Sequence, residues 1–209
     1  MVARVLSVNV AEMRTIRRGG RDVRTGIWKR PLEGAVAARG MNLEGDEQAD
    51  RKVHGGADKA VYAYAREDTE WWEAELGREL EHGTFGENLT LSGVDASGAE
   101  VGERWRVGGA LLEVSEPRLP CFKLGVKMED SRFVKRFAAA LRPGCYLRIA
   151  EAGELAAGDA VEVVERPGHG ITVGDLARTF LFEKDRAPEL LAAPGLSRGW
   201  REFAESRAA

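Results

Sequence analysis

The segment at residues 114–124, VSEPRLPCFKL, places a guanidinium and a thiol on a stretch of chain that two prolines make stiff. Pro117 and Pro120 lie on either side of Arg118, and Cys121 follows directly. Each proline fixes its own φ and favours extended geometry in the residue before it. We therefore expect a strand at residues 104–113 to lead into a rigid, non-helical segment that holds Arg118 and Cys121 in defined directions.

The chemistry open to Cys121 depends on its surroundings. A lone cysteine is commonly a small buried apolar residue, so a structural role is one interpretation. Arg118 and Lys123 are close in sequence, however, and nearby cations favour the thiolate form. A thiolate binds soft metals or attacks electrophiles. From this segment alone, the structural and the chemical roles of Cys121 both remain open.

Three further clusters combine glycine or proline with polar side chains and suggest a shared pocket. They are Trp28-Lys29-Arg30-Pro31, Val53-His54-Gly55-Gly56 with Lys59, and Gly86-Glu87-Asn88-Leu89. Glycines let backbone amides approach a ligand closely, and such amides cradle phosphate. Lys29, Lys59 and Arg118 are candidate partners of an anionic group, and Asn88 of a heterocycle. His54 by itself is more typical of a hydrogen-bonded structural histidine than of a ligand.

Other kinds of site have weaker support in the sequence. Asp46, Glu47 and Asp50 are oxygen ligands suited to a divalent metal, but a solvated acidic loop explains them better. Neither cysteine belongs to a CxxC pair, which argues against a structural zinc site. The chain has no GxSxG, P-loop or GxGxxG motif, so common hydrolase, NTPase and dinucleotide-binding classes are disfavoured.

Composition limits the partners and the compartment. The 209 residues include 31 basic and 34 acidic side chains, so the net charge of −3 gives no support to nucleic-acid or membrane-surface binding. No apolar run approaches the ~20 residues of a transmembrane helix, and the first residues lack the pattern of a signal peptide. Two cysteines cannot form a disulfide framework. We expect a cytoplasmic, reduced protein.

The elements that must position these residues are mostly short strands. Strands are expected at residues 2–10, 24–30, 34–38, 61–65, 145–150 and 160–165, with a hairpin at 103–114 around Gly108-Gly109. Residues 14–24 are basic and glycine-broken, as in a solvated loop or hairpin tip. Helices are expected at 70–80 and 131–141. This pattern predicts a mostly β (α+β) fold, a barrel or closed sheet with helical insertions.

The sequence pattern changes from strand-like to helical at Arg166-Pro167-Gly168. Downstream, residues 171–182, 187–193 and 197–206 read as three short helices, with Thr172 and Ser197 as N-caps. We therefore divide the chain into a β domain at 1–166 and a small three-helix domain at 167–209.

Taken together, the motifs resemble the MOSC domain (molybdenum cofactor sulfurase C-terminal), in particular its YiiM-type branch. The matching segments are GIWKRPLEG from 26, GDEQADRKVHGGADKAVYAY from 45, GTFGENLTLSG from 83, VSEPRLPCFKL from 114 and GCYLRIAEAGELAAGD from 144. The tail from residue 171, including LSRGW, is similar to the three-helix domain of that branch. The motif core spans about residues 26–165, and the resemblance covers nearly the whole chain.

This resemblance implies a barrel-like β domain that binds the molybdenum cofactor, a pterin-based Mo-molybdopterin. Cys121 falls on the family's cysteine and is the expected molybdenum ligand and catalytic residue, or the carrier of a persulfide in relatives that transfer sulfur. Lys29 and Arg118 are then candidates for the cofactor's phosphate. Lys59, Asn88 and the turn at His54, Gly55 and Gly56 would line the same pocket.

The resemblance also implies a reaction. YiiM-type proteins are associated with resistance to N-hydroxylated bases such as 6-hydroxylaminopurine, so the expected activity is reduction of R–NHOH to R–NH2 and water. The chain has no flavin or nicotinamide motif, so the electrons would come from a separate reductase. The alternative is a sulfur- or cofactor-carrier protein with a persulfide on Cys121 and no reductase turnover. Cys145 stands where the family pattern has an aromatic residue, so a second thiol is expected near the site.

Overall fold

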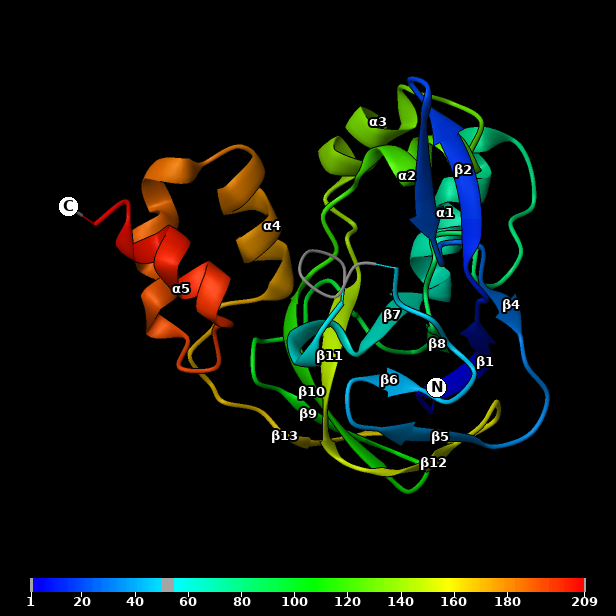
Figure 1. Cartoon of the computed structure of the whole chain (residues 1–209). Coiled ribbons are helices and arrows are strands. Elements are labelled where there is room, and N and C mark those ends of the chain that lie inside the picture. The colour runs from blue at the N-terminus through cyan, green and yellow to red at the C-terminus, as the bar shows by residue number, and fades with distance from the viewer. Residues whose placement is uncertain (1, 50–54, 209) are drawn as a thin grey trace.

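The computed structural model describes residues 2–49 and 55–208 and is built mainly of strands (Figure 1). The strands of the main sheet are β1 (Arg4–Val10), β4 (Arg30–Pro31), β7 (Val61–Ala65), β8 (Leu89–Ser92), β9 (Arg104–Val107), β10 (Ala110–Pro117), β11 (Cys145–Glu151) and β13 (Val161–Glu165). They are hydrogen-bonded in the order β13-β9-β10-β11-β7-β8-β1-β4. The pairs are antiparallel except β7 with β8, which run parallel within the described chain.

The mostly β, α+β class predicted from the sequence is confirmed, but the sheet is not closed into a barrel. Its strand order is linear, and β1 meets the start of the far edge at one isolated bridge between Arg4 and Ala160. The backbone N–H of Val5 adds a hydrogen bond to Asp159 O at 2.9 Å. Residues Ala156 to Asp159 form a turn at this point, and the described contact with the start of β1 consists of this bridge and a few backbone hydrogen bonds rather than a regular ladder.

A curved apolar core fills the concave side of the main sheet. Val8, Leu89, Trp105 and Leu112 are fully buried there, together with residues of a second, three-stranded sheet. That sheet has the order β12-β5-β6 and consists of β5 (Val36–Arg39), β6 (Asn42–Leu43) and β12 (Gly153–Leu155). The hairpin predicted around Gly108-Gly109 is present as β9 and β10.

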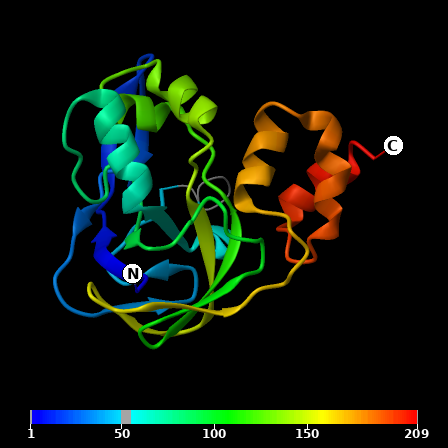
Figure 2. The same ribbon diagram turned by 180° about the vertical axis from the view of Figure 1, so that it is seen from behind.

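Three helices cover one end of the main sheet (Figures 1 and 2). They are α1 (Arg66–Leu76), α2 (Phe122–Lys127) and α3 (Phe133–Ala140). Between them lies an aromatic cluster in which Trp72 stacks on Phe137, with an interplanar angle of 2° and ring centroids 5.9 Å apart. Trp72 Nε1 donates a hydrogen bond to the hydroxyl of Tyr64 at 3.0 Å. Trp72 is therefore a core residue, as expected for a buried tryptophan with a satisfied N–H.

Several expected boundaries are wrong, for identifiable reasons. Helix α1 begins at Arg66, four residues before the expected start, and ends at Leu76 because Gly77 adopts a left-handed conformation (φ 65°). The strand expected at 24–30 is interrupted, since residues 26–29 have no regular structure. The segment expected to be non-helical up to residue 124 becomes helical at Phe122. A proline just before a helix is compatible with it, because the first helical N–H groups need no helical acceptor.

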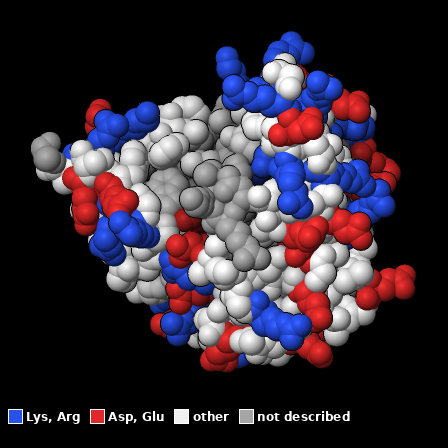
Figure 3. All heavy atoms as spheres, in the orientation of Figure 1, with Lys and Arg blue, Asp and Glu red and all other residues white. Residues whose placement is uncertain are grey.

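The basic segment at residues 14–24 forms a hairpin. The sequence had left a solvated loop and a hairpin both open. It consists of β2 (Arg14–Arg18) and β3 (Arg21–Thr25), a separate two-stranded sheet. Its guanidinium groups form the concentration of basic side chains at the upper edge of the molecule (Figure 3). The Arg18 guanidinium lies 4.0 Å from the ring centroid of Phe122, so the hairpin leans against the start of α2.

The C-terminal segment packs around its own apolar cluster, which includes Leu176, Leu190 and Trp200 and also takes in Val101 from the sheet body. Its elements are α4 (Val173–Leu181), the 3-10 helix η2 (Lys184–Ala192) and α5 (Arg198–Glu205), which lie to one side of the main sheet (Figure 2). Thr172 and Asp175 form a capping box at the start of α4, which confirms Thr172 as its N-cap. None of the described helices is long and apolar enough to cross a membrane.

Candidate functional site

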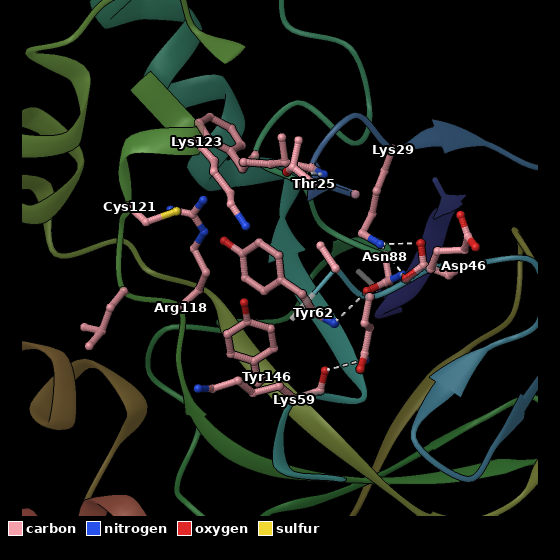
Figure 4. Close-up of a pocket in the computed structure, with 18 residues that line it drawn as sticks. Thr25, Lys29, Asp46, Lys59, Tyr62, Asn88, Arg118, Cys121, Lys123 and Tyr146 are labelled. Carbon is pink, nitrogen blue, oxygen red and sulfur yellow. Dashed lines mark hydrogen bonds and ion pairs between the residues drawn. The ribbon is translucent and has the colours of Figure 1, made fainter. Parts of the chain in front are cut away.

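The motif loops meet in one pocket at the end of the sheet that the helices cover. Its walls come from residues 25–29, 46–49, 85–88 and 118–123, with Tyr62 from β7 and Tyr146 from β11 (Figure 4). It encloses about 670 Å³ of empty space, part of it open to solvent. Segments more than a hundred residues apart in sequence therefore contribute to a single cavity, which is typical of ligand sites built on a rigid sheet.

Cys121 lies in this pocket at the position just before α2. Its thiol is free and half-buried, and its backbone is extended (φ −127°, ψ 170°). The carbonyl of Cys121 accepts a hydrogen bond from Leu124 N at 3.0 Å, which starts the helix. On the other side, Pro117 is still paired with β11. The thiol is thus held between the end of strand β10 and the start of helix α2, in a connection of four residues, 118–121.

Two buried cations lie on either side of Cys121 in the chain, and their ends reach the same part of the pocket (Figure 4). Arg118 is 5% exposed, and its Nη1 atom is buried without a hydrogen-bond partner in the described residues. Its guanidinium lies 5.2 Å from the ring centroid of Phe137. Lys123 is 9% exposed and takes part in no ion pair of the described chain. A buried cation without a partner costs several kcal/mol, so this end of the pocket is suited to an anion.

Two tyrosines direct their hydroxyls towards the same space (Figure 4). Tyr62 and Tyr146 are opposite each other in neighbouring strands, with ring centroids 5.2 Å apart. Tyr62 donates its hydroxyl hydrogen to Pro143 O at 2.8 Å. Burial raises the pKa of Tyr146 to about 12, although the positive charge of Arg118 opposes this shift. Tyr146 is therefore a protonated hydroxyl at neutral pH, able to donate a hydrogen bond to a ligand.

The opposite end of the pocket is electrically balanced. Lys29 Nζ lies 2.5 Å from both carboxylate oxygens of Asp46, and both side chains are buried. Burial lowers the pKa of Lys29, and the attraction of Asp46 opposes that effect. Asn88 donates to Asp46 Oδ2 at 2.9 Å and accepts from Tyr62 N at 3.1 Å. Lys29 and Asn88 line the pocket, but their polar groups are engaged within the protein.

The predicted site residues fall into two groups. Five of them line this pocket: Lys29, Lys59, Asn88, Arg118 and Cys121. Lys59 pairs with Glu116 at 3.1 Å, so its charge is also balanced. Gly55 and Gly56 line a neighbouring cavity instead, next to the 3-10 helix η1 (Ala57–Lys59). His54 lies outside the described residues.

The loop that carries the GENL motif is shaped by its own hydrogen bonds. The buried carboxylate of Glu87 accepts from Gly83 N at 2.6 Å and from Phe85 N at 3.0 Å, and burial raises its pKa. Gly86 has φ 84°, and a Cβ there would approach Ile27 Cγ1 to 2.8 Å. Lys127 fastens this loop to the opposite wall by donating to Ile27 O at 2.9 Å and to Gly83 O at 2.5 Å. These residues form the turn that presents Asn88.

Sequence reasoning did not identify Tyr62, Tyr146, Lys123 and Asp46 as site residues. Lys123 was noted as a neighbour of the thiol, and its spacing from Cys121 was the available signal. The two tyrosines face the pocket only because β7 pairs with β11, which no local pattern encodes. The acidic loop that offered a divalent-metal site instead places Asp46 in an ion pair, and the described residues contain no cluster of His, Cys, Asp or Glu suited to a metal. Asp50 lies outside the described residues.

Cys145 is part of the sheet core rather than of this pocket. It is fully buried between β7 and β10, and burial raises its thiol pKa well above the usual value. Both cysteines are free thiols. The second thiol expected near the site therefore does not line the pocket of Cys121.

Comparisons with known proteins agree with this architecture. The MOSC domain family matches residues 50–162. The uncharacterized protein YflK of Bacillus subtilis is 36% identical over 200 residues, which cover 94% of this chain and 90% of that protein. Protein YiiM of Escherichia coli is 34% identical over 187 residues, 87% of this chain and 83% of that one.

A solved structure and a longer relative add to these matches. The crystal structure of YiiM from Geobacillus stearothermophilus superimposes with a TM-score of 0.83 at 31% identity, covering 99% of this chain and 100% of that one. A protein of Gibberella moniliformis named "Reductase" is 34% identical over 152 residues, which cover 71% of this chain but 27% of that protein. The chain therefore belongs to the MOSC domain family, and within it to the YiiM type. The family resemblance noted in the motifs is confirmed.

Proposed function

We propose that this protein binds the molybdenum cofactor in the Cys121 pocket and reduces N-hydroxylated compounds to amines. The observation that supports the proposal is the pair of buried cations, Arg118 and Lys123, on either side of a free thiol, neither of which has an ion-pair partner among the described residues. The fungal relative named "Reductase" contains the matched segment as about a quarter of its length and supports the reaction class.

The side chains of the pocket fit the chemistry of that cofactor. The cofactor carries a phosphate, and the Arg118 guanidinium has a buried N–H with no partner in the described residues. Lys123 adds a second positive charge beside it. The Cys121 thiolate is a soft ligand, the type that suits molybdenum. Lys29 contributes less charge than its position suggests, because Asp46 neutralises it.

When bound, the cofactor would supply the two-electron redox chemistry at its metal. The overall reaction takes R–NHOH, two electrons and two protons to R–NH2 and water. The chain's own part is to hold the metal through Cys121, to place anionic groups against Arg118 and Lys123, and to offer hydrogen bonds to the substrate. The Tyr146 hydroxyl remains protonated at neutral pH because its pKa is about 12, and it lines the same cavity.

The electrons must come from another protein, since the chain carries no flavin or nicotinamide motif. We propose a separate reductase as the partner. In the relative named "Reductase" the matched segment accounts for 27% of the protein, so most of that chain lies outside the match. The alternative function, a carrier with a persulfide on Cys121, uses the same half-buried thiol.

The first test is the molybdenum content of wild type, Cys121→Ala and the matched control Cys145→Ala, each expressed in cells that make the cofactor. We expect stoichiometric metal in wild type and in Cys145→Ala, whose thiol lies in the core away from the pocket. We expect loss of metal and of hydroxylamine reduction in Cys121→Ala, with an unchanged fold by circular dichroism.

Two outcomes would contradict the reductase proposal. Cys121→Ala with full metal and full activity would exclude both roles of the thiol. Wild type without molybdenum, but with sulfur on Cys121 that cyanide releases, would favour the carrier.

A further inference from the structure

A second cavity lies between the sheet body and the C-terminal helices. On the body side it is lined by η1 together with Glu116 and Leu119, and on the helix side by residues of α4 and α5. It contains about 950 Å³ of empty space, part of it open to solvent, which is within the range of small-molecule sites. Nothing in the proposed cofactor chemistry uses this cavity.

The second cavity adjoins the Cys121 pocket. Lys59 and Leu119 line both of them, so these two side chains form the wall between the cavities. Leu119 is next to Arg118 in the chain and two residues before Cys121. A group that extended from the second cavity past Leu119 would enter the pocket that Cys121, Arg118 and Lys123 line.

The helix side of the second cavity is an aromatic wall. Phe180, Trp200 and Phe203 contact one another, with ring centroids 5.2 to 5.9 Å apart. Trp200 is 7% exposed and fixed by this packing, whereas Phe180 is 37% exposed. Rigid aromatic faces of this kind bind planar rings by stacking and edge contacts.

The body side offers hydrogen-bond acceptors to such a ring. The Glu116 carboxylate is 6% exposed and divides its oxygens between Lys59, at 3.1 Å, and the Ser197 hydroxyl, at 2.7 Å. A carboxylate oxygen has two lone pairs, so Glu116 keeps acceptor capacity for a ring N–H. An aromatic wall opposite a fixed carboxylate selects a planar nitrogen-bearing aromatic compound over an aliphatic one.

We propose that the second cavity is the substrate site, where the aromatic ring of an N-hydroxylated compound packs on Phe180, Trp200 and Phe203 while its N–OH group extends past Leu119 to the Cys121 pocket. This inference rests on the proposed function and assigns its substrate class. It also gives the C-terminal helices a role, since they supply the ring-binding surface.

The test compares two probes that share the reacting group, benzamidoxime, which carries a ring, and acetamidoxime, which does not. Gly199→Phe is the main variant, because Gly199 lines the cavity and a Cβ there meets no atom within 4 Å. The backbone at Gly199 accepts a Cβ without a clash, so the variant is expected to fold with its new ring occupying part of the cavity. Phe180→Ala removes a half-exposed part of the wall, and Phe182→Ala, at an exposed position outside the cavity, is the control.

In Gly199→Phe and Phe180→Ala we expect KM for benzamidoxime to rise about tenfold or more, as the loss of an aromatic contact predicts. KM for acetamidoxime, kcat for both probes and molybdenum content should stay as in wild type and Phe182→Ala. Calorimetric titration with benzamidoxime gives the same comparison without turnover.

These readouts separate the two proposals. Equal KM values in Gly199→Phe and wild type, in an enzyme that reduces both probes, would overturn the substrate site and leave the reductase function intact. A second outcome is that wild type binds benzamidoxime, Gly199→Phe does not, and neither probe is reduced. This outcome would support the binding site for the ring and overturn the reductase function. Wild type that neither binds nor reduces benzamidoxime would overturn the substrate site as well.

Discussion

The burial of the Arg118 charge costs free energy, and the residue lines the Cys121 pocket. Its guanidinium is buried against Phe137, and one N–H has no partner in the described chain. A protein that needed this residue only for stability would supply a carboxylate, as it does for Arg148, which pairs with Asp58 at 2.6 Å and Glu113 at 2.7 Å. Arg118 therefore behaves as half of an ion pair whose other half is a ligand.

We expect Arg118→Met to separate cofactor binding from stability. Methionine keeps most of the volume but removes the unpaired charge, so the free energy of unfolding of the cofactor-free protein should be unchanged or raised by about 1 kcal/mol. Cofactor affinity should fall at least about tenfold, because a charge-assisted hydrogen bond is lost. Urea denaturation and molybdenum retention after gel filtration measure the two effects.

Arg148→Met is the matched control for this comparison. It removes the ion-pair partner of Asp58 and leaves Glu113 with Arg104 alone, so it should destabilise the protein by roughly 2 kcal/mol while the Cys121 pocket keeps its charges. An Arg118→Met protein that lost stability to the same extent would show that Arg118 is structural.

Lys127 is a half-buried lysine whose role differs from that of Arg118. Its Nζ donates to the carbonyls of Ile27 and Gly83, and burial lowers its pKa from 10.5 to about 8. A neutral amine still has two N–H groups for two carbonyl acceptors, so the contact survives deprotonation. Lys127 is thus a clamp between two loops that does not require its charge.

This clamp predicts a rise of stability with pH. Between pH 8 and 10.5 the unfolded chain keeps the Lys127 proton that the folded protein has released, so the free energy of unfolding increases with pH, by at most about 3 kcal/mol for this group. Between pH 7.5 and 9.5 the free energy of unfolding of wild type should therefore rise relative to that of Lys127→Met. Denaturant titrations of both proteins at pH 7.5 and 9.5 measure this change. A difference in unfolding free energy that is the same at both pH values would contradict the lowered pKa of Lys127.

At the scale of single elements, the sequence predicted what local chemistry determines. The hairpin at Gly108-Gly109, the strand at Val61–Ala65 and the capped helix after Thr172 are encoded by neighbouring residues, and all are present. The interruption of the predicted strand at residues 26–29 was not foreseen, because tertiary contacts cause it. A Cβ at Gly26, for example, would lie 2.5 Å from Glu47 O. Its irregular path follows from a loop twenty residues further along.

The same distinction applies to the candidate site. Arg118 and Cys121 were identified because two prolines fix their local geometry, which needs no information from the rest of the chain. The balance of Lys29 by Asp46, and of Lys59 by Glu116, depends on which loops come together, so these lysines appeared more available than they are. Tyr146 was missed because its role depends on the register between β11 and β7.

At the scale of the whole molecule, charge is distributed unevenly. The net charge is −3, yet the β2–β3 hairpin carries five arginines, at positions 14, 17, 18, 21 and 24, and one acidic residue, Asp22. Residues at the base of this hairpin, Thr25 and Gly26, line the Cys121 pocket. If the pocket is the proposed reductase site, a basic element beside it is suited to steering an acidic electron donor towards it.

We expect Arg17→Glu together with Arg21→Glu to slow reduction by a protein donor and to leave reduction by a small reductant unchanged. The rate with an acidic flavoprotein should fall about tenfold or more at low ionic strength, and the difference should shrink as salt is added. Methyl viologen as the donor bypasses docking and reports on the site itself. Arg198→Glu, on the exposed face of α5, is the control; equal loss in that variant would rule out a role specific to the hairpin.

The proposed division of the chain at residue 167 also belongs to this scale and stays a prediction. The C-terminal helices have their own apolar cluster, but that cluster includes Val101, and α5 begins with a hydroxyl bound to Glu116. Arg148 adds a hydrogen bond to Gly195 O at 3.0 Å. Buried polar contacts of this kind tie the helical segment to one orientation on the sheet.

The bridge between Arg4 and Ala160 has a consequence for synthesis on the ribosome. The end of β1 pairs with the nearby β4, but β1 also pairs with β8 on one side and its start reaches Ala160 on the other, and these two partners emerge long after it does. At typical translation rates the interval between Arg4 and Ala160 is roughly 8 to 30 s. During that time the apolar strand β1 has backbone N–H and C=O groups without partners along one edge, and such an edge is prone to aggregation. The nascent chain therefore exposes this strand edge until about three-quarters of it has been made.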